Sequence, residues 1–301
     1  MEMSLAKKHF EHTSAQQAAK QPDTPVATGR ATPYERMLLI LADHKRQLKA
    51  IQSIENKIAL KRTLLPEYDA WVAGVLAANT GKQDDVIMTV MVWRFDIGDL
   101  AHGLAIAEYA LAHHLAMPDT YARTTGTLVA EEVADYALDA LNEDPPNATD
   151  LVGYLRDTEQ LVHDEDMPDE VRAKLHKALG YALKDSDPNK ALVELKRALE
   201  LHSRVGVKKD IERLESQLKK AAKEAKDKAN PIDEPSASVE TPNKNISEET
   251  AINKVVLDMT MPPWKYFGIE DDKSSHSDTP TELPATSVEP IESVVIPPPE
   301  S

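Results

Sequence analysis

Apolar residues recur every three or four positions along most of the first 228 residues, and we find no convincing two-residue alternation there. Such spacing is typical of amphipathic helices rather than strands. The clearest case is a stripe that predicts one long helix over residues 34–62, made of Met37, Leu41, Leu48, Ile51, Ile54 and Ile58. Its start is also marked, since Thr32 can cap the helix, Pro33 suits the first position and Glu35 completes a capping box.

The same pattern predicts further helices at residues 66–79, 84–96, 99–116, 127–143, 148–163, 168–185, 189–203 and 206–227. Residues 84–96 read DDVIMTVMVWRFD and are apolar on nearly every side. A helix of that kind is buried in the middle of a domain. The sequence therefore predicts an all-α protein with this helix at its centre.

A weak internal repeat indicates how the helices pair. Gly103-Leu104 is followed by Ala110-Leu111, and Ala191-Leu192 by Ala198-Leu199, at an offset of 88 residues. This pattern resembles the second helix of tetratricopeptide repeats, where small residues allow paired helices to approach closely. Two loosely matching units do not establish a solenoid, so we predict an array of helical hairpins with weak tetratricopeptide-like repeats.

Composition divides the chain into three parts. Residues 1–31 are polar and are predicted to form a flexible N-terminal arm, and residues 32–228 form the helical body. Residues 229–301 hold 11 of the 20 prolines, with 14 acidic and 4 basic side chains. Such a segment cannot bury enough apolar surface to offset the entropy of ordering, so we predict a disordered, Pro-rich acidic tail.

Charge and cysteine content exclude several classes of protein. The chain has no cysteine, which excludes disulfides, thiolate metal sites and a cysteine nucleophile. It has no apolar run of 18 residues and no apolar core near its start, so neither a membrane span nor a signal peptide is expected. The net charge of −16 argues against a nonspecific nucleic-acid coat. Ten of those units lie in the tail, however, and only −6 remains over residues 1–228.

One face of the predicted helix 34–62 is basic. Opposite its apolar stripe lie Lys45, Arg46, Lys49, Lys57 and Lys61. Cations along one helix face can neutralise DNA phosphates, and a merely solvated face is the alternative interpretation. If the face binds DNA, the acidic tail can compete for it.

Two further patterns indicate contacts with other helices or proteins. The heptad seam formed by Val207, Ile211, Leu214 and Leu218 fits either self-association or docking on a neighbouring helix. Within the tail, Trp264, Tyr266 and Phe267 form an aromatic motif that could fold on a partner, unless the cluster is incidental.

Motifs for catalysis are weak. Gly81-Lys82 is followed by Gln83 and lacks the spacing of a P-loop. Pro168-Asp169 and Glu194-Leu195-Lys196 spell the carboxylate pattern of a metal-dependent nuclease, but a first-turn Asp has a structural explanation at the start of a helix. We predict no catalytic residue, no metal site and no cofactor in this chain.

Three long runs together resemble the small terminase subunit of Peduovirus-like temperate tailed phages. They are residues 83–94 (QDDVIMTVMVWR), 167–177 (MPDEVRAKLHK) and 206–215 (GVKKDIERLE). The resemblance covers roughly residues 30–220, and the runs are collinear rather than short generic motifs.

The resemblance implies a role in packaging viral DNA. Such a subunit recognises the packaging site on concatemeric phage DNA in the host cell cytoplasm and presents it to a large subunit, which is the ATPase. It also implies a homo-oligomer, which can be a ring. The family carries the label of terminase endonuclease subunit, and we place cutting in the complex because this chain shows no convincing nuclease centre. Two alternatives stay open: a helical-repeat protein-binding adaptor without DNA contact, and a metal-dependent endonuclease that uses Asp169 and Glu194.

Overall fold

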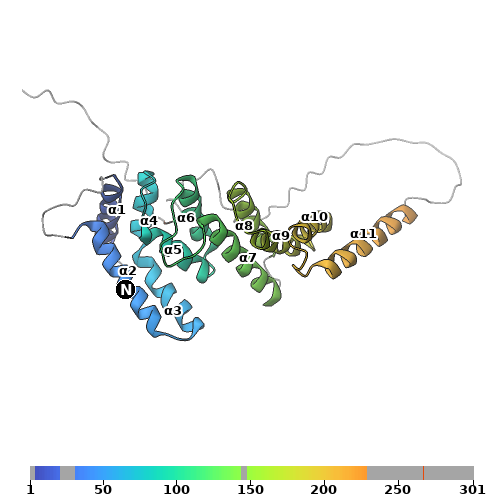
Figure 1. Ribbon diagram of the computed structural model, residues 1–301, viewed down its shortest axis with the longest axis horizontal. Helices are drawn as coiled ribbons and strands as arrows, with labels where there is room; N and C mark the ends of the chain where they lie inside the picture. The colour runs from blue at the N-terminus through green and yellow to red at the C-terminus, as the bar shows by residue number, and fades with distance from the viewer. Residues whose placement is uncertain (1–3, 21–30, 144–147, 229–266, 268–301) are drawn as a thin grey trace, which may run out of the picture. The chain divides into compact units, whose positions relative to one another are not determined.

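The computed structural model describes residues 4–20, 31–143, 148–228 and 267. Within these residues the chain forms eleven α-helices, one short 3-10 helix and no strand, which confirms the all-α prediction (Figure 1). The helices are α1 Leu5–Lys20, α2 Pro33–Ala50, α3 Ile54–Leu64, η1 Leu65–Glu67, α4 Asp69–Ala78, α5 Asp85–Asp96, α6 Leu100–Ala112, α7 Thr125–Glu143, α8 Ala148–Leu161, α9 Asp169–Leu183, α10 Pro188–Leu201 and α11 Lys208–Lys228.

Helix α5 lies at the centre of the apolar core, as its sequence predicts. Every residue from Val86 to Phe95 is buried, and α5 packs against α2, α6, α7 and η1. Its start is capped by Asp84, whose Oδ1 accepts hydrogen bonds from the backbone N–H groups of Val86 at 2.8 Å and Ile87 at 3.1 Å. These bonds satisfy two backbone donors that would otherwise be unpaired at the start of a helix.

Residues 5–20 correct the prediction of a flexible arm, because they form α1, which packs against α4 (Figure 1). The contact depends on small residues. A Cβ atom added to Gly74 of α4 would lie 2.7 Å from the Cβ of Ala15 and 2.4 Å from the carbonyl oxygen of His12. Since two backbones meet here with almost no large side chains between them, α1 has no apolar stripe that periodicity could detect.

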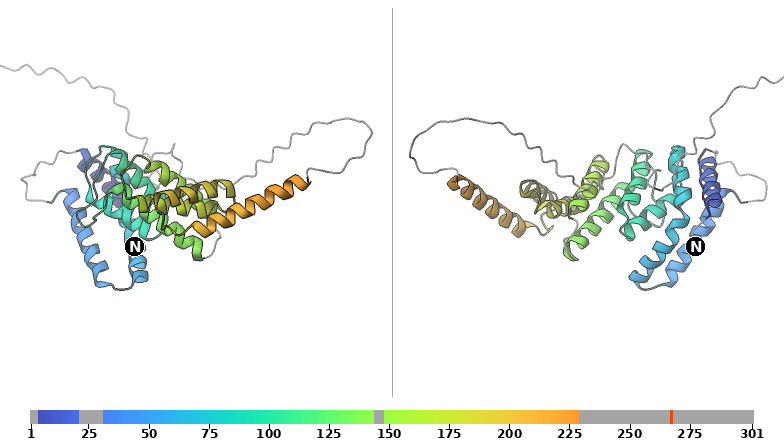
Figure 2. Two further views of the ribbon diagram at one scale, coloured as in Figure 1. Left: turned by 45° about the vertical axis from the view of Figure 1, so that its right-hand side comes forward. Right: turned by 180° about the vertical axis from the view of Figure 1, so that it is seen from behind.

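The predicted helix 34–62 is two helices rather than one, α2 and α3. The capping box at its start is confirmed: the N–H of Glu35 donates to Thr32 Oγ1 at 3.2 Å, and the N–H of Thr32 donates to Glu35 Oε2 at 2.6 Å. The backbone becomes extended at Ile51, and Ser53 caps α3 by accepting from the N–H of Asn56. Figure 2 shows α2 and α3 as two separate helices joined by this short connection.

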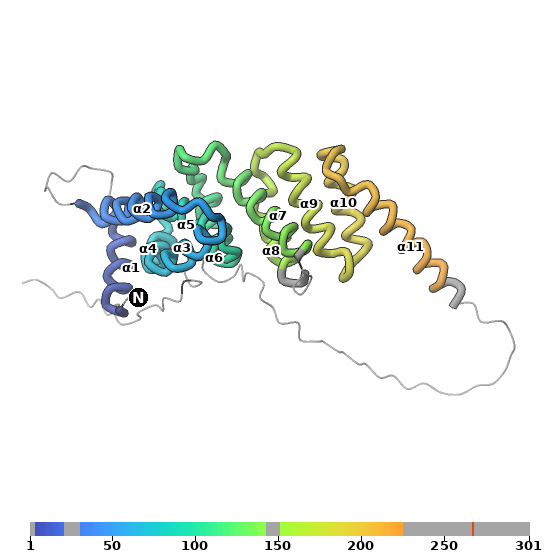
Figure 3. The backbone as a smooth tube through the Cα atoms, turned by 90° about the horizontal axis from the view of Figure 1, so that it is seen from below, coloured from blue at the N-terminus to red at the C-terminus, as the bar shows by residue number. Residues whose placement is uncertain are grey.

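The two repeat segments form similar helix pairs, α5 with α6 and α9 with α10 (Figure 3). In both pairs an Asp caps the second helix: Asp99 accepts from the N–H of His102, and Asp187 from that of Lys190. A glycine also brings each pair together, since a Cβ on Gly103 would lie 2.5 Å from the Phe95 ring, and one on Gly180 would lie 2.7 Å from the Leu195 side chain. The helical-hairpin array is observed, and its tetratricopeptide-like character stays a prediction.

Among the described helices, none is long and apolar enough to cross a membrane.

Candidate functional site

Positive charge gathers on α2 and α3. Residues 33–64 carry seven basic and three acidic side chains, in a body that is acidic overall. The buried stripe of α2, which consists of Met37, Leu41, His44 and Leu48, turns the opposite side of this helix outward. Only Leu64 is buried in α3, so most of that helix is accessible as well. The α2–α3 pair therefore forms the candidate surface for an anionic partner.

Three of the five predicted basic residues suit this role. Arg46 has 77% of its side chain exposed and pairs with Asp43 one turn earlier. Lys49 is exposed near the end of α2, and Lys57 is half-buried on α3. Cations in such positions can exchange a solvent contact for a phosphate at little cost.

Lys45 and Lys61 lie in different surroundings. Burial lowers the pKa of Lys45, and the carboxylate of Asp85 opposes that shift. Lys61 has only 13% of its side chain exposed and pairs with Asp96 of α5. Beside it, Arg62 donates to the carbonyl oxygen of Ile97 at 3.3 Å. Lys61 thus helps to hold α3 against α5, and the structure does not bring all five residues onto one open face.

The rest of the body is unevenly charged. Residues 125–166, which include α7 and α8, contain twelve acidic side chains and a single basic one. Helix α11 contains eight basic and five acidic side chains. Because DNA phosphates are repelled by the acidic segment and attracted by the basic ones, only part of this body can face a nucleic acid.

The heptad seam of α11 is used within the chain for at least three of its four residues. Val207, Ile211 and Leu214 are buried in the apolar core, and α11 packs against α10. Leu218 is only half-buried. Docking on a neighbouring helix therefore accounts for the first three positions, and the accessible part of the seam begins at Leu218.

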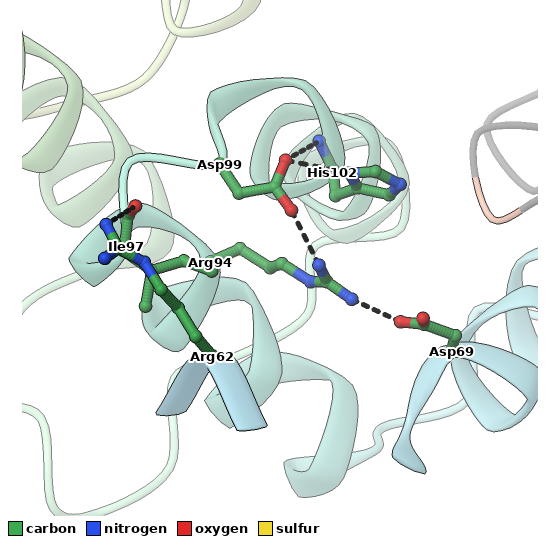
Figure 4. A network of polar contacts seen from close by, with 6 residues as sticks. All are labelled: Arg62, Asp69, Arg94, Ile97, Asp99 and His102. Carbon is green, nitrogen blue, oxygen red and sulfur yellow. Dashed lines mark hydrogen bonds and ion pairs between the residues drawn. The ribbon is translucent and has the colours of Figure 1, made fainter. Parts of the chain in front are cut away.

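A buried polar network joins α4, α5 and α6 (Figure 4). The Arg94 guanidinium, with 8% of its side chain exposed, pairs with Asp69 and, at 2.6 Å, with Asp99. Asp99 Oδ1 also lies 2.8 Å from His102 Nδ1. Burial raises the pKa of Asp69, and the nearby Arg94 charge opposes this shift. Burial also opposes ionisation of Asp99, but the hydrogen bond and charge of His102, with Arg94, lower the pKa of Asp99 overall.

Sequence reasoning missed this network. The available signal was a single arginine in the otherwise apolar run 84–96, because a charge in a buried helix needs carboxylate partners. Both Arg94 Nη atoms donate to carboxylates within the network. It therefore fastens three helices together and is not arranged to bind DNA.

The carboxylates of the nuclease alternative have structural neighbours. Asp169 is the exposed first residue of α9. Glu194 Oε2 on α10 lies 2.8 Å from His176 Nδ1 on α9 and links those two helices. In the part of the chain that the structure describes, no group of three or more His, Asp or Glu side chains could hold a metal ion.

The aromatic motif is only partly described. Trp264 and Tyr266 lie outside the described residues, as does the rest of segment 229–301 apart from Phe267. Phe267 is 8% exposed and packs into the apolar core of the body.

The described residues form an all-helical fold, and the α2–α3 pair is its candidate surface for an anionic partner. Residues 38–170, which run from α2 to the start of α9, match the family model described as phage small terminase subunit. A curated relative, "Terminase, endonuclease subunit" of Escherichia phage P2, is 44% identical over 245 residues, which cover 81% of this chain and 94% of the relative. No solved structure matches. The chain therefore belongs to the phage small terminase subunit family, as its sequence runs indicate.

Proposed function

We propose that this chain recognises the packaging site on concatemeric phage DNA with its α2–α3 surface and presents that site to the large terminase ATPase subunit. The observation that carries the proposal is the set of exposed or half-buried cations on α2 and α3, Arg46, Lys49 and Lys57, in a body whose net charge is negative. Membership of the small terminase subunit family supports the same role.

The charge pattern also favours one orientation of the DNA. DNA phosphates are attracted electrostatically by the basic helices and repelled by the acidic segment 125–166. A subunit with this distribution binds DNA along a limited surface rather than coating it. Recognition of one site also needs contacts with base edges, which carry the sequence information that phosphate contacts lack.

Cutting belongs, in this proposal, to the complex with the large subunit. The relative from phage P2 carries the word endonuclease in its name. In this chain, Asp169 stands at an exposed helix start and Glu194 pairs with His176, so each has a structural role without a metal. The place of action is the host cell cytoplasm, where phage DNA is packaged.

The proposal also includes self-association of the chain. We infer a homo-oligomer, and a ring is one closed form that it can take. The support comes from α11, whose seam continues beyond the contact with α10 at Leu218. If this residue lies in the oligomer contact, Leu218→Glu lowers the mass measured by light scattering and leaves the helical content unchanged. An unchanged mass places the contact elsewhere.

The decisive test is DNA binding and cleavage by the full chain, with and without the large subunit, on packaging-site and scrambled duplexes. The double variant Arg46→Glu with Lys49→Glu is expected to weaken binding at least tenfold. It should also reduce the slope of log affinity against log salt concentration by about 2, or about 1 for each phosphate that is no longer neutralised. A matched control is Lys190→Glu, because Lys190 also pairs with an Asp one turn earlier and has 65% of its side chain exposed.

Two results would contradict the proposal. Equal affinity for scrambled and packaging-site DNA would contradict the role in site recognition. An unchanged affinity of the double variant would contradict the assignment of DNA binding to the α2–α3 surface. Mg²⁺-dependent cleavage by the chain alone, abolished by Asp169→Ala or Glu194→Ala, would instead support the endonuclease alternative.

A further inference from the structure

Phe267 lies far along the chain from the helices and is nevertheless buried against them. It follows the last residue of α11, Lys228, by 39 positions, and its exposed fraction is only 8%. Its ring centroid is 4.9 Å from that of His102, with an interplanar angle of 63°. The Arg94 Cζ atom lies 5.9 Å from the Phe267 centroid. One aromatic side chain of the tail thus contacts both α5 and α6.

The Phe267 ring packs against the polar network of α4, α5 and α6. Arg94 donates its Nη hydrogens to Asp69 and Asp99, and this fixes the plane of the guanidinium. The Arg94 Nε atom is buried without a hydrogen-bond partner. A guanidinium held in this way can still attract the electron-rich face of an aromatic ring, and the attraction is strongest where water is excluded.

His102 is the second side chain of the network that contacts the Phe267 ring. Its Nδ1 atom lies 2.8 Å from Asp99 Oδ1, so the same carboxylate orients both Arg94 and His102. The angle between the His102 and Phe267 rings is in the edge-to-face range that aromatic pairs prefer. An aliphatic side chain could fill the same space but would lack both of these interactions.

We propose that this surface of α5 and α6 is a docking site for an aromatic anchor, and that its occupant is Phe267 of the same chain. The inference goes beyond DNA recognition and does not depend on it. It gives Phe267, one residue of the aromatic motif, a contact within the chain, in place of the separate partner protein that the sequence suggested.

A photo-cross-linking experiment on the full-length chain tests the contact. The photoreactive analogue p-benzoylphenylalanine replaces Phe267, and mass spectrometry maps the products in an equal mixture of ordinary and ¹⁵N-labelled protein. The expected products join position 267 to residues 94–102 of the same chain. The matched control places the analogue at Phe10, which is 56% exposed on α1, and should give no product with residues 94–102.

Hydrogen exchange supplies a second readout that needs no analogue. Phe267→Ala is expected to speed amide exchange in the first turn of α6 at least fivefold, Phe267→Tyr should retain most of the protection, and Phe10→Ala should leave it unchanged. The proposal is overturned if the products join two different chains, if they scatter over the body, or if they move to the large subunit when it is added. Equal exchange in Phe267→Ala and the unaltered chain overturns it as well.

Discussion

The indole Nε1 of Trp71 donates a hydrogen bond of 3.0 Å to Oδ2 of Asp84, and both side chains are buried. Trp71 belongs to α4, and Asp84 caps α5, so this bond connects the two helices at the start of the central one. Burial raises the pKa of Asp84 to about 6, although the hydrogen bonds from Trp71, Ile87 and Val86 favour the ionised form.

Asp84 makes stability depend on pH in a predictable direction. Its folded-state pKa lies above the unfolded value, so the folded protein holds the proton more tightly. The stabilisation of the fold that the raised pKa of Asp84 provides is therefore fully present below about pH 4. It is lost as the pH rises through 6. A shift of about two units corresponds to ~3 kcal/mol in the free energy of unfolding.

Urea unfolding at several pH values can isolate this contribution by comparison with Asp84→Asn, which cannot ionise. The stability of the unaltered chain relative to the variant should fall between pH 4 and pH 7. A constant difference over that range would show that Asp84 does not titrate as its surroundings indicate.

Gly74→Ala tests the contact between α1 and α4. The new methyl group would lie 2.4 Å from the backbone oxygen of His12, so α1 must shift, at a cost of about 1–3 kcal/mol. Trypsin should then cleave faster at Lys7 and Lys8 within α1. Ala78→Ser, at the half-buried end of α4, is the control, and equal cleavage rates in both variants would contradict the close approach.

Arg94→Ala should destabilise the protein strongly. The change leaves Asp69 and Asp99 without their shared cation in a largely buried place, which typically costs about 3 kcal/mol or more. Arg46→Ala removes an exposed pair and should cost less than about 1 kcal/mol. Thermal unfolding of both variants gives the comparison, and similar midpoints would mean that the network contributes little.

Deletion of residues 229–301 should strengthen DNA binding at low salt. The segment carries a net charge of −10 and can compete with phosphates for the basic helices. Because screening weakens such competition, the difference from the full chain should shrink as salt rises. Deletion of residues 270–301 alone keeps Phe267 and removes eight acidic side chains and one basic one. An unchanged affinity in both deletions would reject the competition.

Sequence patterns predicted the elements whose burial is carried by large apolar side chains. The central helix α5 and the cap at Thr32 are examples, since both leave their signal within a few neighbouring residues. Helix α1 was missed because Ala15 and Gly74 are small and lie 59 positions apart. The break between α2 and α3 was missed because no proline or glycine marks it, and the apolar spacing continues across the Ser53 cap to Ile54 and Ile58.

The candidate site shows the same limit. Lys49 and Lys61 are alike in the sequence, but one is exposed and the other pairs with Asp96, 35 positions away. Which lysines remain available depends on partners that only the folded chain brings near. For the same reason the partners of Arg94 could not be assigned in advance, since Asp69 is 25 positions from it.

The place of α1 has a practical consequence for anyone who shortens this protein. A version that begins at residue 32 looks reasonable on composition, but it would strip α4 of its covering helix and expose the apolar surface beneath Ala15. Exposed surface of that kind promotes aggregation. Affinity tags and truncation boundaries are therefore best placed before Leu5, where the helix begins.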